Sequence, residues 1–156
     1  MNEILTFHNK EVDIKLSKNA NEQSRQLDSI LVIEIQIYFS CLLGKRLAFY
    51  SEQAVEGAWK LSADEMTDVL GKAQQLTDKI YIRFNTVMTK SCPVGDYIGP
   101  PPVTDFMIAN QKPYVPNWLY IDYKNGLWSG QFGWQSSDKE YANTKQIRAS
   151  ALSTVT

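Results

Sequence analysis

Side chains that bind metals or act as strong nucleophiles are scarce in this sequence. Its 156 residues include one histidine, His8, and two cysteines, Cys41 and Cys92. A zinc site takes three or four suitable ligands, and a nucleophilic thiol needs a base or a positive field beside it. Nothing in the sequence places His8 next to either cysteine. We therefore expect free structural thiols, no bound metal and no cofactor.

The sequence also lacks the short motifs of phosphate, dinucleotide and hydrolase sites. It contains no G-x-G-x-x-G, P-loop, G-x-S-x-G or H-E-x-x-H. Its densest acidic run, between Glu52 and Asp68, is explained by solvation and by a helix start, where the macrodipole favours negative charge. We therefore name no catalytic residue.

Neither sign of charge is in excess, because 16 basic residues stand against 17 acidic ones and Lys45-Arg46 is the only adjacent basic pair. Nucleic-acid binding normally leaves a basic patch, so we expect no nucleic-acid partner. No run of apolar residues is long enough to cross a membrane. Charges in residues 1–13 interrupt the apolar run that a signal peptide needs, so we expect a cytoplasmic protein.

The six prolines all fall between Pro93 and Pro116. Proline removes a backbone donor and fixes φ, so residues 92–117 are predicted to form a loop. The loop is too apolar for simple disorder, and we expect it to pack over a sheet, with a short element at 103–108. Residues 135–156 are polar and are predicted to be a loosely attached tail, which leaves residues 1–134 as one domain.

Residues 118–134 are predicted to form a β-hairpin around Asn125-Gly126. Both residues accept positive φ, which a type I′ turn requires at its two central positions. The turn fixes the register, so Lys124 faces Leu127 and Trp118 faces Gly133. The expected core face carries Leu119, Ile121, Tyr123, Trp128, Phe132 and Trp134. The expected mixed face carries Trp118, Tyr120, Asp122, Lys124, Leu127, Ser129 and Gln131.

Alternation of apolar and polar residues predicts further strands. Residues 3–17 are predicted to be a hairpin with its turn at Asn9-Lys10. Residues 30–43 are predicted to be a strand rather than a buried helix, because Glu34 and Gln36 alternate with apolar neighbours and would lie far apart around a helix.

The remaining segments complete the expected sheet. We predict a turn at Gly44-Lys45, followed by strands at 46–50 and 55–61, the latter antiparallel and with a short helix as the alternative. Residues 79–91 also alternate and are predicted to be a strand. Residues 17–28 are polar and are predicted to be a loop with at most one helical turn.

One helix is predicted over residues 62–76. Ser62 and Glu65 match the S-x-x-E capping box, and apolar residues follow at helical spacing. Gly71 weakens the prediction, since glycine costs about 1 kcal/mol inside a helix. The sequence therefore predicts an α+β fold in which this helix packs on a mostly antiparallel sheet.

Two surfaces are candidate sites. Paired strands would place polar side chains on one sheet face beneath the proline-rich loop: Glu34, Gln36, Tyr38, Arg83 and Asn85. The second candidate is the outer face of the hairpin, with Trp118, Tyr120 and Leu127, and Tyr97 of the loop is a further candidate binding residue. Solvation of the sheet face and packing under the loop are the simpler interpretations of these residues.

The sequence favours a non-enzymatic module that binds a small molecule or a protein near these surfaces. One alternative is a small enzyme that uses the polar sheet face, with Glu34 or Arg83 as a polar catalytic group. A third is a homodimer or larger homo-oligomer whose contact surface includes Trp118. The sequence identifies no ligand or partner.

Overall fold

The computed structural model describes residues 1–39, 43–89, 103–105, 108 and 110–135. Cys41, Cys92, Tyr97 and the predicted tail at 135–156, apart from its first residue, lie outside these ranges. The elements are β1 (Asn2–Phe7), β2 (Lys10–Leu16), α1 (Lys18–Ser24), β3 (Leu31–Phe39), β4 (Leu43–Ser51), β5 (Trp59–Lys60), α2 (Ala63–Leu70), β6 (Gln74–Gln75), β7 (Ile80–Thr89), β8 (Val103–Asp105), a 3₁₀ turn η1 (Lys112–Tyr114), β9 (Trp118–Lys124) and β10 (Leu127–Gly133).

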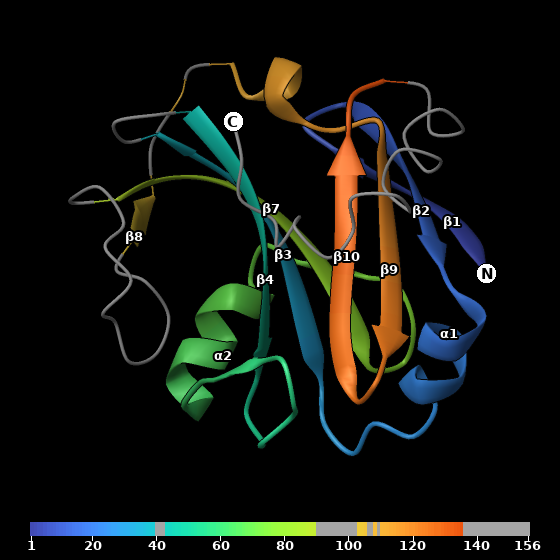
Figure 1. Ribbon diagram of the computed structural model, residues 1–156. Helices are drawn as coiled ribbons and strands as arrows, with labels where there is room; N and C mark the ends of the chain where they lie inside the picture. The colour runs from blue at the N-terminus through green and yellow to red at the C-terminus, as the bar shows by residue number, and fades with distance from the viewer. Residues whose placement is uncertain (40–42, 90–102, 106–107, 109, 136–156) are drawn as a thin grey trace.

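These strands form two mixed sheets in a single small domain (Figure 1). One sheet has four strands in the order β1-β2-β9-β10, and the other has six, in the order β5-β4-β3-β7-β6 with β8 paired to β7. The α+β class is confirmed, but the expectation of a mostly antiparallel sheet is only partly right. The β2–β9, β3–β7 and β4–β5 pairs are parallel. Parallel pairs join segments through crossovers rather than tight turns, so turn chemistry does not reveal them.

The C-terminal hairpin has the predicted register. Lys124 pairs with Leu127 and Trp118 pairs with Gly133. Asn125 and Gly126 have φ values of 55° and 80°, as a type I′ turn requires.

In the N-terminal hairpin the turn lies one residue earlier than predicted.

The N-terminal turn is His8-Asn9, with φ values of 51° and 64°, and Phe7 pairs with Lys10. The predicted Asn9-Lys10 turn would have required positive φ at Lys10. Asn and His adopt that conformation more readily than most residues, which explains the shift.

Residues 31–39 and 80–89 are strands, as predicted, and they pair in parallel at the centre of the six-stranded sheet. The predicted turn at Gly44-Lys45 is wrong, because both residues lie within β4. The strand predicted at 55–61 is limited to Trp59–Lys60, and it runs parallel to β4 rather than antiparallel. Gly57, with a φ of 87°, breaks the extended backbone before it.

The main core lies between the two sheets. From the four-stranded sheet it takes the alternate residues Val12, Ile14, Leu119 and Ile121, which are fully buried. The six-stranded sheet contributes Leu31, Ile33, Ile35, Ile80 and Ile82. Each such side chain stabilises the fold by roughly 1.5–3 kcal/mol on transfer from water. The inward faces of both sheets are therefore committed to packing, and polar chemistry is left to the outward faces.

Helix α2 covers one end of the outward face of the six-stranded sheet (Figure 1). Met66 of the helix packs with Val32, Ala48 and Tyr50 of the sheet. The predicted capping box is present: the Ser62 hydroxyl accepts from the Glu65 amide, and Glu65 accepts from the Ser62 amide. The helix ends at Leu70 rather than at residue 76.

Residue Gly71 caps the C-terminus of α2, and Gln74 and Gln75 beyond it form the short strand β6. Residues 18–24 form a seven-residue helix, α1, which exceeds the single turn predicted there, with Ser17 as its N-cap.

No helix in the described part of the chain is long and apolar enough to cross a membrane.

Candidate functional site

The central three strands of the six-stranded sheet bring polar side chains together on its outward face. Odd-numbered residues of β3 point into the inter-sheet core, so Glu34 and Gln36 point the other way. The β3–β7 register places Glu34 opposite Arg83, and the β3–β4 register places Gln36 opposite Arg46. Residues far apart in the sequence thereby become neighbours on one surface.

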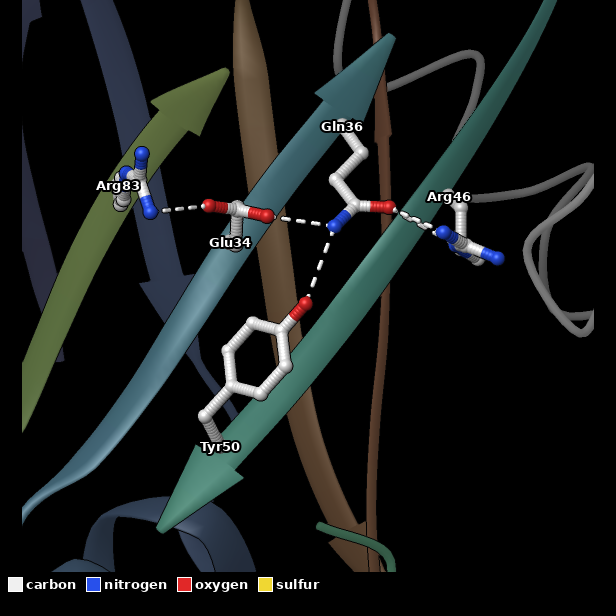
Figure 2. Close-up of polar contacts among 5 residues, drawn as sticks. All are labelled: Glu34, Gln36, Arg46, Tyr50 and Arg83. Carbon is white, nitrogen blue, oxygen red and sulfur yellow. Dashed lines mark hydrogen bonds and ion pairs between the residues drawn. The ribbon is translucent and has the colours of Figure 1, made fainter. Parts of the chain in front are cut away.

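Four of these side chains form a continuous row of contacts across the sheet (Figure 2). Arg83 Nη1 lies 2.8 Å from Glu34 Oε2. The other carboxylate oxygen, Oε1, accepts from Gln36 Nε2 at 2.5 Å. Gln36 Oε1 in turn accepts from Arg46 Nε at 2.9 Å and from Arg46 Nη2 at 2.6 Å. We call Arg83, Glu34, Gln36 and Arg46 the polar row.

The polar row is largely removed from water. Gln36 is fully buried, Glu34 is 3% exposed and Arg83 is 8% exposed. Arg83 Nε is buried and has no hydrogen-bond partner among the described residues. An unsatisfied buried donor costs about 1–3 kcal/mol, so Arg83 Nε lowers the stability of the folded protein by about that amount.

Two tyrosines border the polar row. Tyr50 OH accepts a hydrogen bond from Gln36 Nε2 at 3.2 Å, and burial raises the pKa of Tyr50 to about 12, with the Glu34 charge adding to the effect. The Arg46 guanidinium carbon lies 5.7 Å from the centre of the Tyr38 ring. An alanine at Gly44 would place its Cβ 2.3 Å from the same ring, so glycine leaves room for Tyr38 to lie across β4.

The contacts decide which chemistry this face suits. Both Glu34 oxygens are engaged, one by Arg83 and one by Gln36, so the carboxylate is not free to take a proton from a substrate. The row holds two guanidinium groups and one carboxylate. One positive charge is therefore in excess, and it belongs to the Arg46 end.

Among the predicted site residues, Glu34, Gln36, Tyr38, Arg83 and Asn85 share this face. Asn85 pairs with Gln36 in the β3–β7 register. Trp118 and Tyr120 do not join them, because they lie on β9 of the other sheet, and Tyr97 is outside the described residues. Trp118 is 2% exposed, so the outer hairpin face does not present its ring to solvent as a contact patch.

Sequence reasoning missed Arg46 and Tyr50. Both lie on β4, whose pairing with β3 the misplaced turn at Gly44-Lys45 obscured. That turn would have placed Arg46 opposite Leu43 instead of opposite Gln36. The available signal was the alternation of Gly44, Arg46, Ala48 and Tyr50 along one strand face.

In the described part of the chain, no three His, Cys, Asp or Glu side chains lie close enough together to hold a metal ion. Comparison of the chain with models of known families, with curated proteins and with solved structures found no match.

Proposed function

We propose that the chain is a non-enzymatic binding module whose polar row recognises an anionic group of its ligand, a carboxylate or a phosphate. The supporting observation is the excess guanidinium of Arg46. It contacts the neutral amide oxygen of Gln36 and the ring of Tyr38, and no carboxylate among the described residues pairs with it.

A half-buried guanidinium without a counter-charge favours an anion more strongly than an exposed one, because less water screens the interaction. Its planar fork matches the two oxygens of a carboxylate or phosphate. In Figure 2, Arg46 ends the row with part of its guanidinium directed away from Gln36. An anion at this position would complete the charge balance of the row.

The engaged carboxylate gives the enzyme alternative less support, because Glu34 would have to leave both Arg83 and Gln36 to act as a base. Recognition requires no such rearrangement at the Arg46 end. The polar row then acts as a fixed support that holds the guanidinium in one orientation.

The test is a titration with inorganic phosphate and with succinate, monitored by thermal unfolding and by amide NMR shifts, with sodium chloride at matched ionic strength. A ligand at 100 times its Kd stabilises the native state by about 2.7 kcal/mol. We expect stabilisation and shifts around Arg46 in the wild type and their loss in Arg46→Met. Arg25→Met, at an exposed position, is the matched control. Equal responses in both variants, or no response to either anion, would contradict the proposal.

A further inference from the structure

Strand β1 is an open edge of the four-stranded sheet. It has β2 on one side and, among the described residues, no strand on the other (Figure 1). The opposite edge of this sheet, β10, is covered by β4. Lys45 Nζ of β4 donates to the Phe132 carbonyl at 2.8 Å, and a Cβ added at Gly130 would lie 2.8 Å from Leu47 Cδ1. Of the two edges of this sheet, β1 is therefore the one that can accept a further strand.

The backbone of β1 directs alternate hydrogen-bonding groups toward the open side. Residues that flank a two-residue hairpin turn exchange both backbone hydrogen bonds, and every second pair beyond them does the same. Phe7 and the other odd-numbered residues of β1 therefore bond to β2. The N–H and C=O groups of the even-numbered residues, Asn2, Ile4 and Thr6, point away from it. The Thr6 carbonyl accepts from the side-chain amide of Gln74, which agrees with this direction, and its second lone pair can accept another donor.

The side chains of β1 leave this edge accessible. Asn2, Glu3, Ile4 and Thr6 are exposed. Ile4 is 58% exposed, more than any other large apolar side chain in the described part of the chain. Edge strands usually avoid pairing through charged side chains, prolines or bulges. β1 has one charged residue, no proline and an uninterrupted register with β2, so it is suited to addition of a strand.

We infer that β1 pairs with β1 of a second copy of the chain, antiparallel and about a two-fold axis at Ile4. Ile4 then lies opposite Ile4 of the partner subunit, and Asn2 lies opposite Thr6 of the partner subunit. The two four-stranded sheets continue across the contact as one sheet. The exposed Ile4 side chain packs against its own copy, and each other favourable pair occurs twice, because a two-fold contact is self-complementary.

Two neighbouring registers would use the same outward backbone groups, and both are less favourable. An axis at Glu3 would place two carboxylates directly opposite each other, which is destabilising. An axis at Leu5 would move Asn2 beyond the end of the partner strand, so its outward groups would lose their partners. The axis at Ile4 avoids both problems and pairs all three even-numbered residues.

Charged side chains on β2 favour the same register. Three exposed residues of β2 lie beside the even-numbered residues of β1: Glu11 beside Thr6, Asp13 beside Ile4, and Lys15 beside Asn2. With the axis at Ile4, Glu11 shares a cross-strand row with Lys15 of the partner subunit, and symmetry repeats this row. An axis at Leu5 would instead place Glu11 in a row with Asp13 of the partner subunit. Two rows of opposite charge outnumber the one row in which Asp13 meets its copy, and this complementarity identifies a second copy of the chain as the occupant.

The test is sedimentation velocity of the full chain from micromolar to millimolar concentration. A contact between two six-residue strands lies at the low end of interface size, so we expect a weak dimer that dissociates on dilution. Ile4→Lys keeps the backbone and places two like charges opposite each other, so it should raise the dimer Kd by at least about tenfold. Ile4→Pro removes an outward N–H that β2 does not use, and it should act in the same direction. Met88→Lys, at another exposed apolar position, is the matched control and should dimerise as the wild type does.

Amide hydrogen exchange tests which strand forms the contact. The Thr6 amide should be protected in the dimer and should exchange rapidly in Ile4→Lys, whereas the Leu5 and Phe7 amides, bonded to β2, should stay protected in both proteins. A dimer that Ile4→Lys leaves intact, or one whose Thr6 amide exchanges rapidly, would overturn the inference. A chain that stays monomeric at millimolar concentration would also overturn it and would leave the edge to an extended segment of another protein. Arg46→Met should leave the dimer intact, so failure here and failure of anion recognition are distinguishable.

Discussion

Arg83 and Glu34 face each other on adjacent parallel strands, with 2.8 Å between Nη1 and Oε2, and both are more than nine-tenths buried. Buried charges depend on each other, because removal of one leaves the other desolvated and uncompensated. Disruption of this pair should therefore lower the free energy of unfolding more than disruption of any other contact in the polar row.

Arg83→Met should lower the free energy of unfolding by about 3–5 kcal/mol, since it leaves Glu34 buried without its cation. Urea denaturation measures the change. Arg25→Met, at an exposed position, should have little effect. The double variant Glu34→Leu/Arg83→Met should be less destabilised than the sum of the single variants. A loss below about 1 kcal/mol for Arg83→Met would mean that the ion pair is solvated in solution.

Gly126→Val should destabilise the hairpin by about 1–3 kcal/mol, the usual cost of a non-glycine residue in a sparsely populated backbone region. Gly126 has a φ of 80°, and a Cβ added there would meet no atom within 4 Å, so the cost is backbone strain rather than a clash. Lys124→Val introduces the same residue at an exposed strand position and serves as the control. An unchanged thermal midpoint for Gly126→Val would argue against the type I′ turn.

Ser62→Ala should lower stability by about 0.5–2 kcal/mol at neutral pH, because it removes the side-chain cap of α2.

The hydrogen bond from the Ser62 amide, followed by that from its hydroxyl, lowers the pKa of Glu65 below 4.5. A carboxyl with a lowered folded-state pKa stabilises above its unfolded pKa and loses that contribution as the pH falls. Glu65→Gln should keep the capping box but lose this acid dependence. Acid denaturation curves that are identical for the wild type and Glu65→Gln would contradict the assignment.

Tyr50 should make the protein less stable in alkali. Its pKa is raised from 10.0 to about 12. A raised folded-state pKa means that the contribution is complete below pH 10 and is lost as the pH rises toward 12, by on the order of 2 kcal/mol. Denaturation at pH 9 and pH 11.5 should show a smaller loss for Tyr50→Phe than for the wild type. Tyr114→Phe is the control, and an equal alkaline loss in all three proteins would exclude the mechanism.

The parts of the fold that depend on local chemistry could be predicted from the sequence. Asn125-Gly126 admits a single tight turn, so the register of β9 and β10 followed residue by residue. Ser62 and Glu65 likewise predicted the start of α2, because a capping box depends only on residues that are close in the sequence. The end of α2 was predicted too late, although Gly71 was the visible signal, because apolar spacing continued beyond it.

The parts that depend on pairing between distant strands could not be predicted. Apolar periodicity showed which side of β3 and β7 faces the core, but not that the two strands are parallel neighbours. Arg46 was missed because its partner depends on where the chain turns between β3 and β4, and a shift of that turn changes every pair. The sequence placed Trp118 on the outer face of the hairpin but could not show that its ring is buried there, because burial depends on what packs over that face.

The parallel pair β2–β9 has a consequence for how the chain acquires this structure. The Ser17 hydroxyl donates to Asp122 Oδ1, 105 residues away, at the end of this pair. Such long-range contacts slow folding, since a large loop closes before they form. At synthesis rates of roughly 5–20 residues per second, β9 follows β2 by about 5–20 s. Throughout that interval β2 has one of its two edges without a strand, so the nascent chain needs protection there from pairing with other chains.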